Sequence, residues 1–231
     1  MLKIKLLFIT LLLLSVNSYA QDCVILLHGL SKSDRDMSKL AASLEKAHFY
    51  PVNFDYQSRE HSIETLAENV IRSAIRRCEG KEKIHFVTHS MGGILVRYYL
   101  SQNSIENLGR IVMLGPPNKG SEAVDAYRRV PGFKMIGGPA GLQLGTGKLS
   151  VPKMIGAANF EVGIIAGTRS INLILSSILP GKDDGKVTVE STHLSGMSDH
   201  IALPVTHPFM MKNKKVIAQV IHFLQTGKFH S

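Results

Sequence analysis

Ser90 is the residue whose neighbours in the sequence most favour nucleophilic chemistry. It lies in the stretch His89-Ser90-Met91-Gly92-Gly93, between an apolar segment that reads as a strand, 84–88, and an apolar segment that reads as a helix. A serine in such a tight turn projects its hydroxyl above the sheet, and Gly92 lets the helix pack against the strand. We therefore expect Ser90 to attack a carbonyl carbon and form an acyl-enzyme. The alternative is a serine that only caps the helix.

A serine hydroxyl becomes a nucleophile when a histidine takes its proton and a carboxylate orients that histidine. The acid candidates are Asp183 and Asp184, which lie in a turn ahead of what reads as a short strand. The histidine candidates are His193, His200, His207, His222 and His230. His222 falls within an apolar helical pattern, so we expect a structural or surface role for it.

The stretch Thr88-His89-Ser90-Met91-Gly92-Gly93 resembles the Gly-His-Ser-Met-Gly-Gly signature of small lipases and esterases in the α/β-hydrolase superfamily, the triacylglycerol-lipase-like serine hydrolases. Thr88 departs from this pattern, because glycine is usual there, and the turn must accommodate a β-branched side chain. The resemblance extends over residues 21–231, with the matched motifs in the family's order. It implies an α/β-hydrolase fold, hydrolysis of carboxylic esters as an esterase or lipase, and no cofactor.

The resemblance also selects among the acid and base candidates. The family's order along the chain is serine, acid, histidine, and its acid lies in an Asp-Gly-X-Val segment, which matches Asp184. Asp183 is the reserve candidate and would otherwise help to fix the turn. The family's histidine lies in a loop before the last helix, which matches His207, with His200 as its competitor. The implied catalytic residues are Ser90, Asp184 and His207.

A carbonyl under attack develops negative charge, which two preplaced N–H groups would stabilise. Met91 follows the nucleophile directly and supplies one amide at the start of a helix. The loop after the first strand reads His28-Gly29-Leu30 and resembles the His-Gly-X motif of lipases, which implies the Leu30 amide as the second donor. Alternatively, His28 only shapes this loop.

The elements that must position these residues alternate between strand and helix. This alternation predicts a mostly parallel sheet with helices on both faces and with ligands gathered at the carboxyl ends of the strands. Ser62 is placed to cap the second helix, and Gly227 to end the last one. The expected strands are 23–28, 51–56, 84–88, 110–114 and 162–166, and the expected helices cover 37–47, 63–75, the stretch through Ile94 to Tyr98, and 213–226.

The segment 116–159 resists this pattern, because it is rich in proline and glycine and has little regular periodicity. Long irregular segments in compact domains are often functional covers or binding loops. We expect it to form a wall or partial lid of the substrate site. The alternative is a packed structural loop with a short helix near 123–128.

The first twenty residues read as a signal peptide. Lys3 and Lys5 precede an apolar run too short to span a bilayer, and small residues precede a cut after Ala20. We therefore expect a periplasmic or secreted protein, with one domain over 21–231. The two cysteines, Cys23 and Cys78, both lie in the exported part. They form either a disulfide, which would stabilise the fold by roughly 2–4 kcal/mol, or two buried thiols.

The sequence is basic, with a formal charge of +9, of which +7 remains on residues 21–231. The basic residues are scattered and form no stripe with interleaved aromatics, so we expect no nucleic-acid partner. A transient contact with an anionic membrane surface is compatible with the charge. We expect a monomer that binds an ester or lipid substrate. Asp199 and His200 are a conceivable metal pair, but no HExxH pattern or Cys/His cluster accompanies them, so we expect no metal.

Other functions use the same residues differently. An acyltransferase of the cell envelope would pass the acyl group to an alcohol or lipid instead of water, and an amidase or thioesterase is chemically close. A binding protein on an inactive hydrolase scaffold is the alternative from another class, and the retained catalytic candidates argue against it.

Overall fold

The computed structural model describes residues 21–128 and 132–230. The expected signal peptide and its cut after Ala20 lie outside these residues. The centre of the fold is a six-stranded sheet in the order β2-β1-β3-β4-β5-β6, in which all neighbouring strands are parallel. The strands are β1 (Cys23–Leu27), β2 (Tyr50–Phe54), β3 (Ile84–His89), β4 (Leu108–Leu114), β5 (Val162–Gly167) and β6 (Asp199–Leu203).

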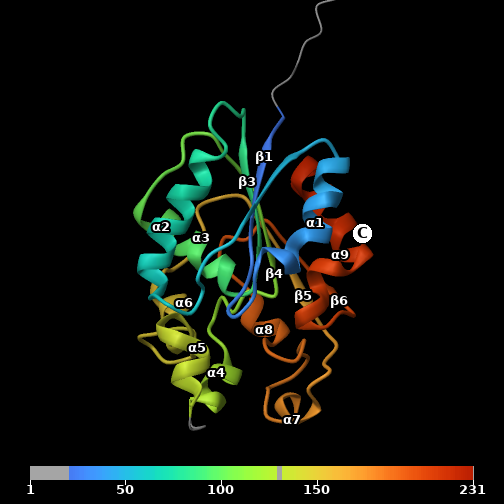
Figure 1. Cartoon of the computed structure of the whole chain (residues 1–231). Helices are drawn as coiled ribbons and strands as arrows, with labels where there is room; N and C mark the ends of the chain where they lie inside the picture. Colours follow the sequence, from blue (N-terminus) through green and yellow to red (C-terminus); the bar gives the residue numbers. More distant parts are fainter. Residues whose placement is uncertain (1–20, 129–131, 231) are drawn as a thin grey trace, which may run out of the picture.

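Helices cover both faces of the sheet (Figure 1), which confirms the predicted fold class. The longest four form the two layers: α2 and α3 pack on one face, α1 and α9 on the other. The helices are α1 (Asp34–Lys46), α2 (Ile63–Arg76), α3 (Met91–Gln102), α4 (Glu122–Tyr127), α5 (Phe133–Leu142), α6 (Val151–Met154), α7 (Leu173–Ser176), α8 (Val189–Thr192), the 3₁₀ helix η1 (His207–Lys212) and α9 (Lys214–Thr226). Within residues 21–128 and 132–230, no helix combines the length and hydropathy needed to cross a membrane.

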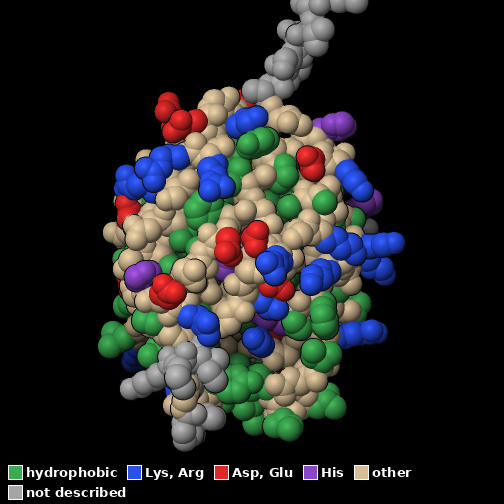
Figure 2. Space-filling view, in the orientation of Figure 1, with side chains coloured by type: hydrophobic (Ala, Val, Ile, Leu, Met, Phe, Trp, Pro, Cys, Tyr) green, Lys and Arg blue, Asp and Glu red, His purple; other side chains and the backbone are tan. Residues whose placement is uncertain are grey.

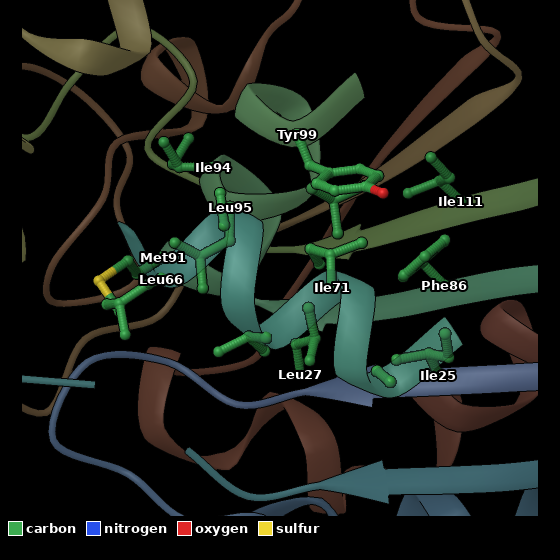
Figure 3. Packing of buried hydrophobic residues seen from close by; sticks show 14 of the residues in the cluster. Ile25, Leu27, Leu66, Ile71, Phe86, Met91, Ile94, Leu95, Tyr99 and Ile111 are labelled. Atoms are coloured by element: carbon green, nitrogen blue, oxygen red, sulfur yellow. The ribbon is translucent and has the colours of Figure 1, made fainter. Parts of the chain in front are cut away.

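The strands are apolar throughout because the sheet is covered on both sides. Successive side chains of a strand point to opposite faces. In β1, Ile25 and Leu27 join the cluster under α2 and α3, whereas Val24 and Leu26 join the cluster under α1 and α9. Figure 3 shows the first of these clusters, with Ile25 and Leu27 close to side chains of α2 such as Ile71.

Helix ends follow the capping signals of the sequence. The Ser62 hydroxyl accepts a hydrogen bond from the Thr65 N–H at the start of α2 (3.4 Å). The Asn213 side chain caps α9, and Gly227 ends that helix with a φ of +80°, which glycine adopts without strain. These predicted boundaries are confirmed.

Two predicted features of the C-terminal part need correction. The residues after Asp184 form no regular strand; they lead into the short helix α8, because the Thr188 hydroxyl accepts a hydrogen bond from the Ser191 N–H (3.1 Å) and caps that turn. The edge strand β6 was not predicted. It carries His200 and is only partly buried, so its sequence lacks a long apolar run.

The proline- and glycine-rich segment folds into three short helices, α4, α5 and α6. The buried Arg97 of α3 holds this segment through its guanidinium. It donates hydrogen bonds to the backbone carbonyls of Asn118 (3.1 Å), Pro152 (3.1 Å) and Gly156 (2.8 Å). Burial lowers the pKa of Arg97 to about 10. The group therefore stays charged at neutral pH and ties the segment to the helix that follows Ser90.

Cys23 and Cys78 form a disulfide with a Cα–Cα distance of 5.8 Å, which confirms the first of the two alternatives. It joins the first residue of β1 to the turn that follows α2. The loop that it closes spans 55 positions, for which the chain-entropy model gives about 4 kcal/mol of stabilisation. A disulfide of this kind indicates an extracellular or lumenal compartment.

Candidate active site

Ser90 occupies the turn between β3 and α3 with φ 53° and ψ −121°, a conformation that costs a non-glycine residue free energy. The turn is held by a hydrogen bond from the Ser90 N–H to the Leu114 carbonyl (2.8 Å). A Cβ on Gly92 would lie 2.8 Å from the Leu27 carbonyl oxygen, so glycine is required for the helix to approach β1. This is the close packing that the sequence pattern predicts around a serine nucleophile.

Thr88 fits at the position where the related signature has glycine. Its side chain is buried, and a Cβ added to Gly93 would lie 3.2 Å from its hydroxyl oxygen. The space that Thr88 fills is therefore provided by the missing side chain of Gly93.

His207 and Asp184 form a buried pair beside this turn. The His207 Nδ1 lies 2.7 Å from the Asp184 Oδ2. The other carboxylate oxygen, Oδ1, accepts hydrogen bonds from the backbone N–H groups of Lys186 (3.0 Å) and Val187 (2.9 Å). The His207 N–H also donates to the Asp184 carbonyl (2.9 Å). A carboxylate held in this way accepts a hydrogen bond from the Nδ1–H of His207, which keeps the proton on Nδ1 and leaves the lone pair on Nε2.

Gly115, at the end of β4, makes room for this pair, a role that the sequence did not reveal. Its φ is +55°, and a Cβ there would lie 3.0 Å from the Asp184 Oδ2 and 3.1 Å from the His207 Nδ1. Any larger residue would push the carboxylate and the imidazole apart.

The competing acid and histidines lie elsewhere. The Asp183 Oδ1 accepts hydrogen bonds from the Ser176 hydroxyl and the Gly185 N–H, both at 2.7 Å, and so fixes the turn. His200 lies on β6, bonded to the Thr192 hydroxyl (2.8 Å) and stacked on His193. His222 stacks on His230 at the end of the chain. Among the described residues no group of three His, Cys, Asp or Glu side chains is placed to hold a metal ion.

His28 shapes the loop that carries Leu30. Its ring stacks on Tyr56 with 4.1 Å between centroids, its Nδ1 bonds the Gly29 carbonyl (2.9 Å), and its Nε2 accepts the Tyr56 N–H (3.3 Å). Desolvation lowers the pKa of His28 and outweighs the Gly29 hydrogen bond and the charge of Asp55, which both raise it. The lowered pKa keeps the ring neutral at neutral pH. Leu30 follows this anchor and lines the same cavity as Ser90, the residue before the first residue of α3, Met91.

His89, the residue before Ser90, contacts His207. The sequence analysis assigned no role to His89. Its Nε2 bonds the His207 carbonyl (3.0 Å), and the two ring centroids are 4.6 Å apart. Burial, and then the neighbouring His207, lower the pKa of His89 well below its ordinary value. A neutral His89 thus supports the His207 backbone without adding a second positive charge.

Ser90 and His207 line the same cavity, which has a volume of about 340 Å³. This is within the range of small-molecule sites. The wall is mainly apolar and includes Leu30, Val124, Leu144, Val187 and Pro208. Part of it, including Val124 and Leu144, comes from the segment 116–159.

Two lysines add positive charge to the lining of this cavity, Lys32 and Lys186. Lys32 pairs with Asp36 (3.2 Å). Lys186 is an exposed residue, yet desolvation by the surrounding protein lowers its pKa, and the positive charge of Lys32 lowers it further. The lining of the cavity is thus mainly apolar and includes two basic side chains.

Comparison with known proteins identifies relatives of this architecture. Lysosomal thioesterase PPT2-B of Xenopus laevis is 30% identical over 126 residues, which cover 51% of this chain and 43% of the relative. The match thus spans less than half of that relative's length.

Solved structures show the same fold. The lipase BlEst2 of Bacillus licheniformis in its mature form has a TM-score of 0.69 and 19% identity, covering 89% of this chain and 92% of that one. Phospholipase PlaB of Legionella pneumophila has a TM-score of 0.71 and 16% identity, covering 90% of this chain and 60% of that one.

The family is given by a longer match along the sequence. Residues 23–153, which include the β1 loop and the Ser90 turn, match the model of the palmitoyl protein thioesterase family. The chain therefore belongs to the palmitoyl protein thioesterase family, with the fold of the α/β-hydrolase lipases and esterases.

Proposed function

We propose that this protein is an exported serine hydrolase that releases fatty acyl groups from thioesters and carboxylic esters through an acyl-enzyme on Ser90. The observation that carries this proposal is the buried His207–Asp184 pair at 2.7 Å on the same apolar cavity as the strained Ser90 turn. The family match and the thioesterase activity named for the relative from Xenopus laevis support a thioester as the bond cleaved.

In this mechanism the His207 Nε2 takes the proton of the Ser90 hydroxyl as its oxygen attacks the acyl carbonyl carbon. Asp184 stabilises the imidazolium that forms. The Met91 and Leu30 amides bind the oxyanion. His207 then returns the proton to the leaving thiol or alcohol, and a water molecule, activated in the same way, releases the fatty acid and restores Ser90.

The apolar wall binds the acyl chain, and its length sets the preference among substrates. No cofactor takes part in this sequence of steps. The disulfide supports export, and the predicted cut after Ala20 would be tested by N-terminal sequencing of the mature protein.

The test of the proposed function is covalent labelling with a fluorophosphonate probe, combined with steady-state hydrolysis of acyl thioesters and p-nitrophenyl esters of increasing chain length. We expect the wild type to label and Ser90→Ala to lose labelling and turnover. His207→Gln is compared with His200→Gln, and only the former is expected to abolish turnover. A folded wild type that does not label, or full activity in Ser90→Ala, would refute the proposal.

A further inference from the structure

The short segment around α7 exposes four large aliphatic side chains. The exposed fractions are 65% for Ile171, 76% for Leu173, 85% for Ile174 and 58% for Ile178. Two other side chains of this segment, Leu175 and Leu179, pack inward against Ala123 of α4. The core contact of the segment therefore does not use the four exposed side chains. We call these four the α7 surface: Ile171, Leu173, Ile174 and Ile178. An exposed group of apolar side chains of this kind marks an interaction site.

The exposed charged side chains of the segment that carries the α7 surface, residues 168–186, are all positive. Arg169 and Lys182 are exposed on either side of it, and no carboxylate of the described residues forms an ion pair with either. The acids of residues 168–186 are Asp183 and Asp184, and both are buried. The solvent-facing side of this segment is thus apolar and cationic, without an exposed acid.

The α7 surface lies at the carboxyl edge of the sheet, the edge that carries the candidate active site (Figure 1). Figure 2 shows hydrophobic side chains gathered at this lower end of the molecule, with lysine and arginine side chains above them. The Ser176 hydroxyl of α7 donates to the Asp183 Oδ1 (2.7 Å), next to the acid that pairs with His207. Lys186, which lines the cavity, follows in the same turn.

We propose that the α7 surface docks on an anionic lipid membrane. The aliphatic side chains enter the boundary between headgroups and acyl chains, and Arg169 and Lys182 bind lipid phosphates. A lipid surface fits better than a protein partner because the surface is aliphatic and lacks the aromatic anchors typical of protein interfaces. The net charge of +7 on residues 21–231 favours the same partner. Docking goes beyond the proposed hydrolysis: it brings the cavity to the lipid that carries the acyl group.

The test is co-sedimentation of the mature protein with vesicles of phosphatidylcholine, with and without phosphatidylglycerol. We expect binding to the anionic vesicles. The double variant Ile174→Ser/Ile178→Ser should bind at least about tenfold more weakly, because two aliphatic side chains no longer enter the bilayer. The variant Arg169→Gln/Lys182→Gln should lose about 30-fold in affinity for anionic vesicles and show no change with neutral ones.

The matched control is Leu149→Ser/Met154→Ser, which removes two comparably exposed apolar side chains near α6. It should bind vesicles like the wild type. All variants should hydrolyse a soluble short-chain ester at the wild-type rate, since none of the changed residues lines the cavity. Ser90→Ala should still bind vesicles, so a failure of the proposed hydrolysis is distinguished from a failure of docking.

Three outcomes would overturn the inference. The first is a wild type that does not bind anionic vesicles. The second is equal loss of binding in the control and in the α7 variants. The third is a wild-type dimer in light scattering that Ile174→Ser/Ile178→Ser converts to a monomer, which would assign the α7 surface to a second copy of the chain.

Discussion

Replacing Asp184 by Asn tests the assignment of the acid most sharply. In the structure one carboxylate oxygen faces the His207 Nδ1, and the other accepts two backbone N–H groups. An asparagine keeps the second arrangement by placing its carbonyl oxygen on those N–H groups. Its amide NH₂ then faces the His207 Nδ1 and donates to it. The imidazole must therefore carry its proton on Nε2, where it cannot accept the proton of Ser90.

The magnitude follows from this change of tautomer. The equivalent substitution in the serine-protease triad lowers kcat by about 10⁴, which corresponds to about 5.5 kcal/mol of barrier. We expect a loss of about 10³–10⁴ in kcat with little change in KM, because the apolar cavity is untouched. The matched control is Asp183→Asn. Its side chain bonds Ser176 and Gly185, away from the histidine, so kcat should fall less than about tenfold.

The assay is steady-state and burst-phase hydrolysis of a p-nitrophenyl ester, with the thermal midpoint measured for each variant. The reasoning would be refuted if Asp184→Asn stayed within tenfold of the wild-type kcat. It would also be refuted if Asp183→Asn, folded and with an unchanged thermal midpoint, lost as much activity as Asp184→Asn.

Three further predictions concern the fold. The free energy of unfolding should fall as the pH is lowered from about 6.5 to 5. Histidines whose pKa is lowered in the folded protein stay neutral in this range, whereas in the unfolded chain they take up protons, which favours unfolding. These histidines are His28, His85, His89 and His200. Calorimetric midpoints that stay flat or rise in this range would contradict it. Cys23→Ser/Cys78→Ser should lower the free energy of unfolding by about 4 kcal/mol in urea titrations, and a loss under 1 kcal/mol would show that the cross-link hardly matters. Gly92→Ala should distort the serine turn, because its Cβ would lie 2.8 Å from the Leu27 carbonyl oxygen, and abolish fluorophosphonate labelling; full labelling would disprove the tight packing.

The architecture is predictable from the sequence where burial produces a regular pattern of apolar residues. β1 is a continuous apolar run because both faces of the sheet are covered, and α2 and α9 have capping residues that can be recognised in the sequence. β6 lacks that pattern because it lies at the edge of the sheet and is only partly buried. The β-branched residues after Asp184 suggest a strand, but the cap by Thr188 turns them into α8. Local hydrogen bonding overrides propensity there.

The candidate site is predictable in part for a similar reason. The Ser90 turn is a local feature, so its residues are adjacent in the sequence. The choice between Asp183 and Asp184 depends on which carboxylate points to His207, and adjacent side chains of a turn point in different directions. The contributions of His89 and Gly115 depend on contacts with residues about 70 to 120 positions away, which no local pattern records.

Arg97 gives the cavity a property that its lining residues alone do not reveal. Arg97 of α3 holds the segment 116–159, which supplies part of the cavity wall, mainly through the backbone carbonyls of Asn118, Pro152 and Gly156. The position of the wall relative to Ser90 is therefore largely independent of which side chains the wall carries. For the proposed reaction, we expect a change of Val124, a partly exposed side chain of the lining, to alter the space for an acyl chain while the backbone contacts of Arg97 keep the wall in place. The proposed enzyme could then change its chain-length preference while keeping its catalytic geometry.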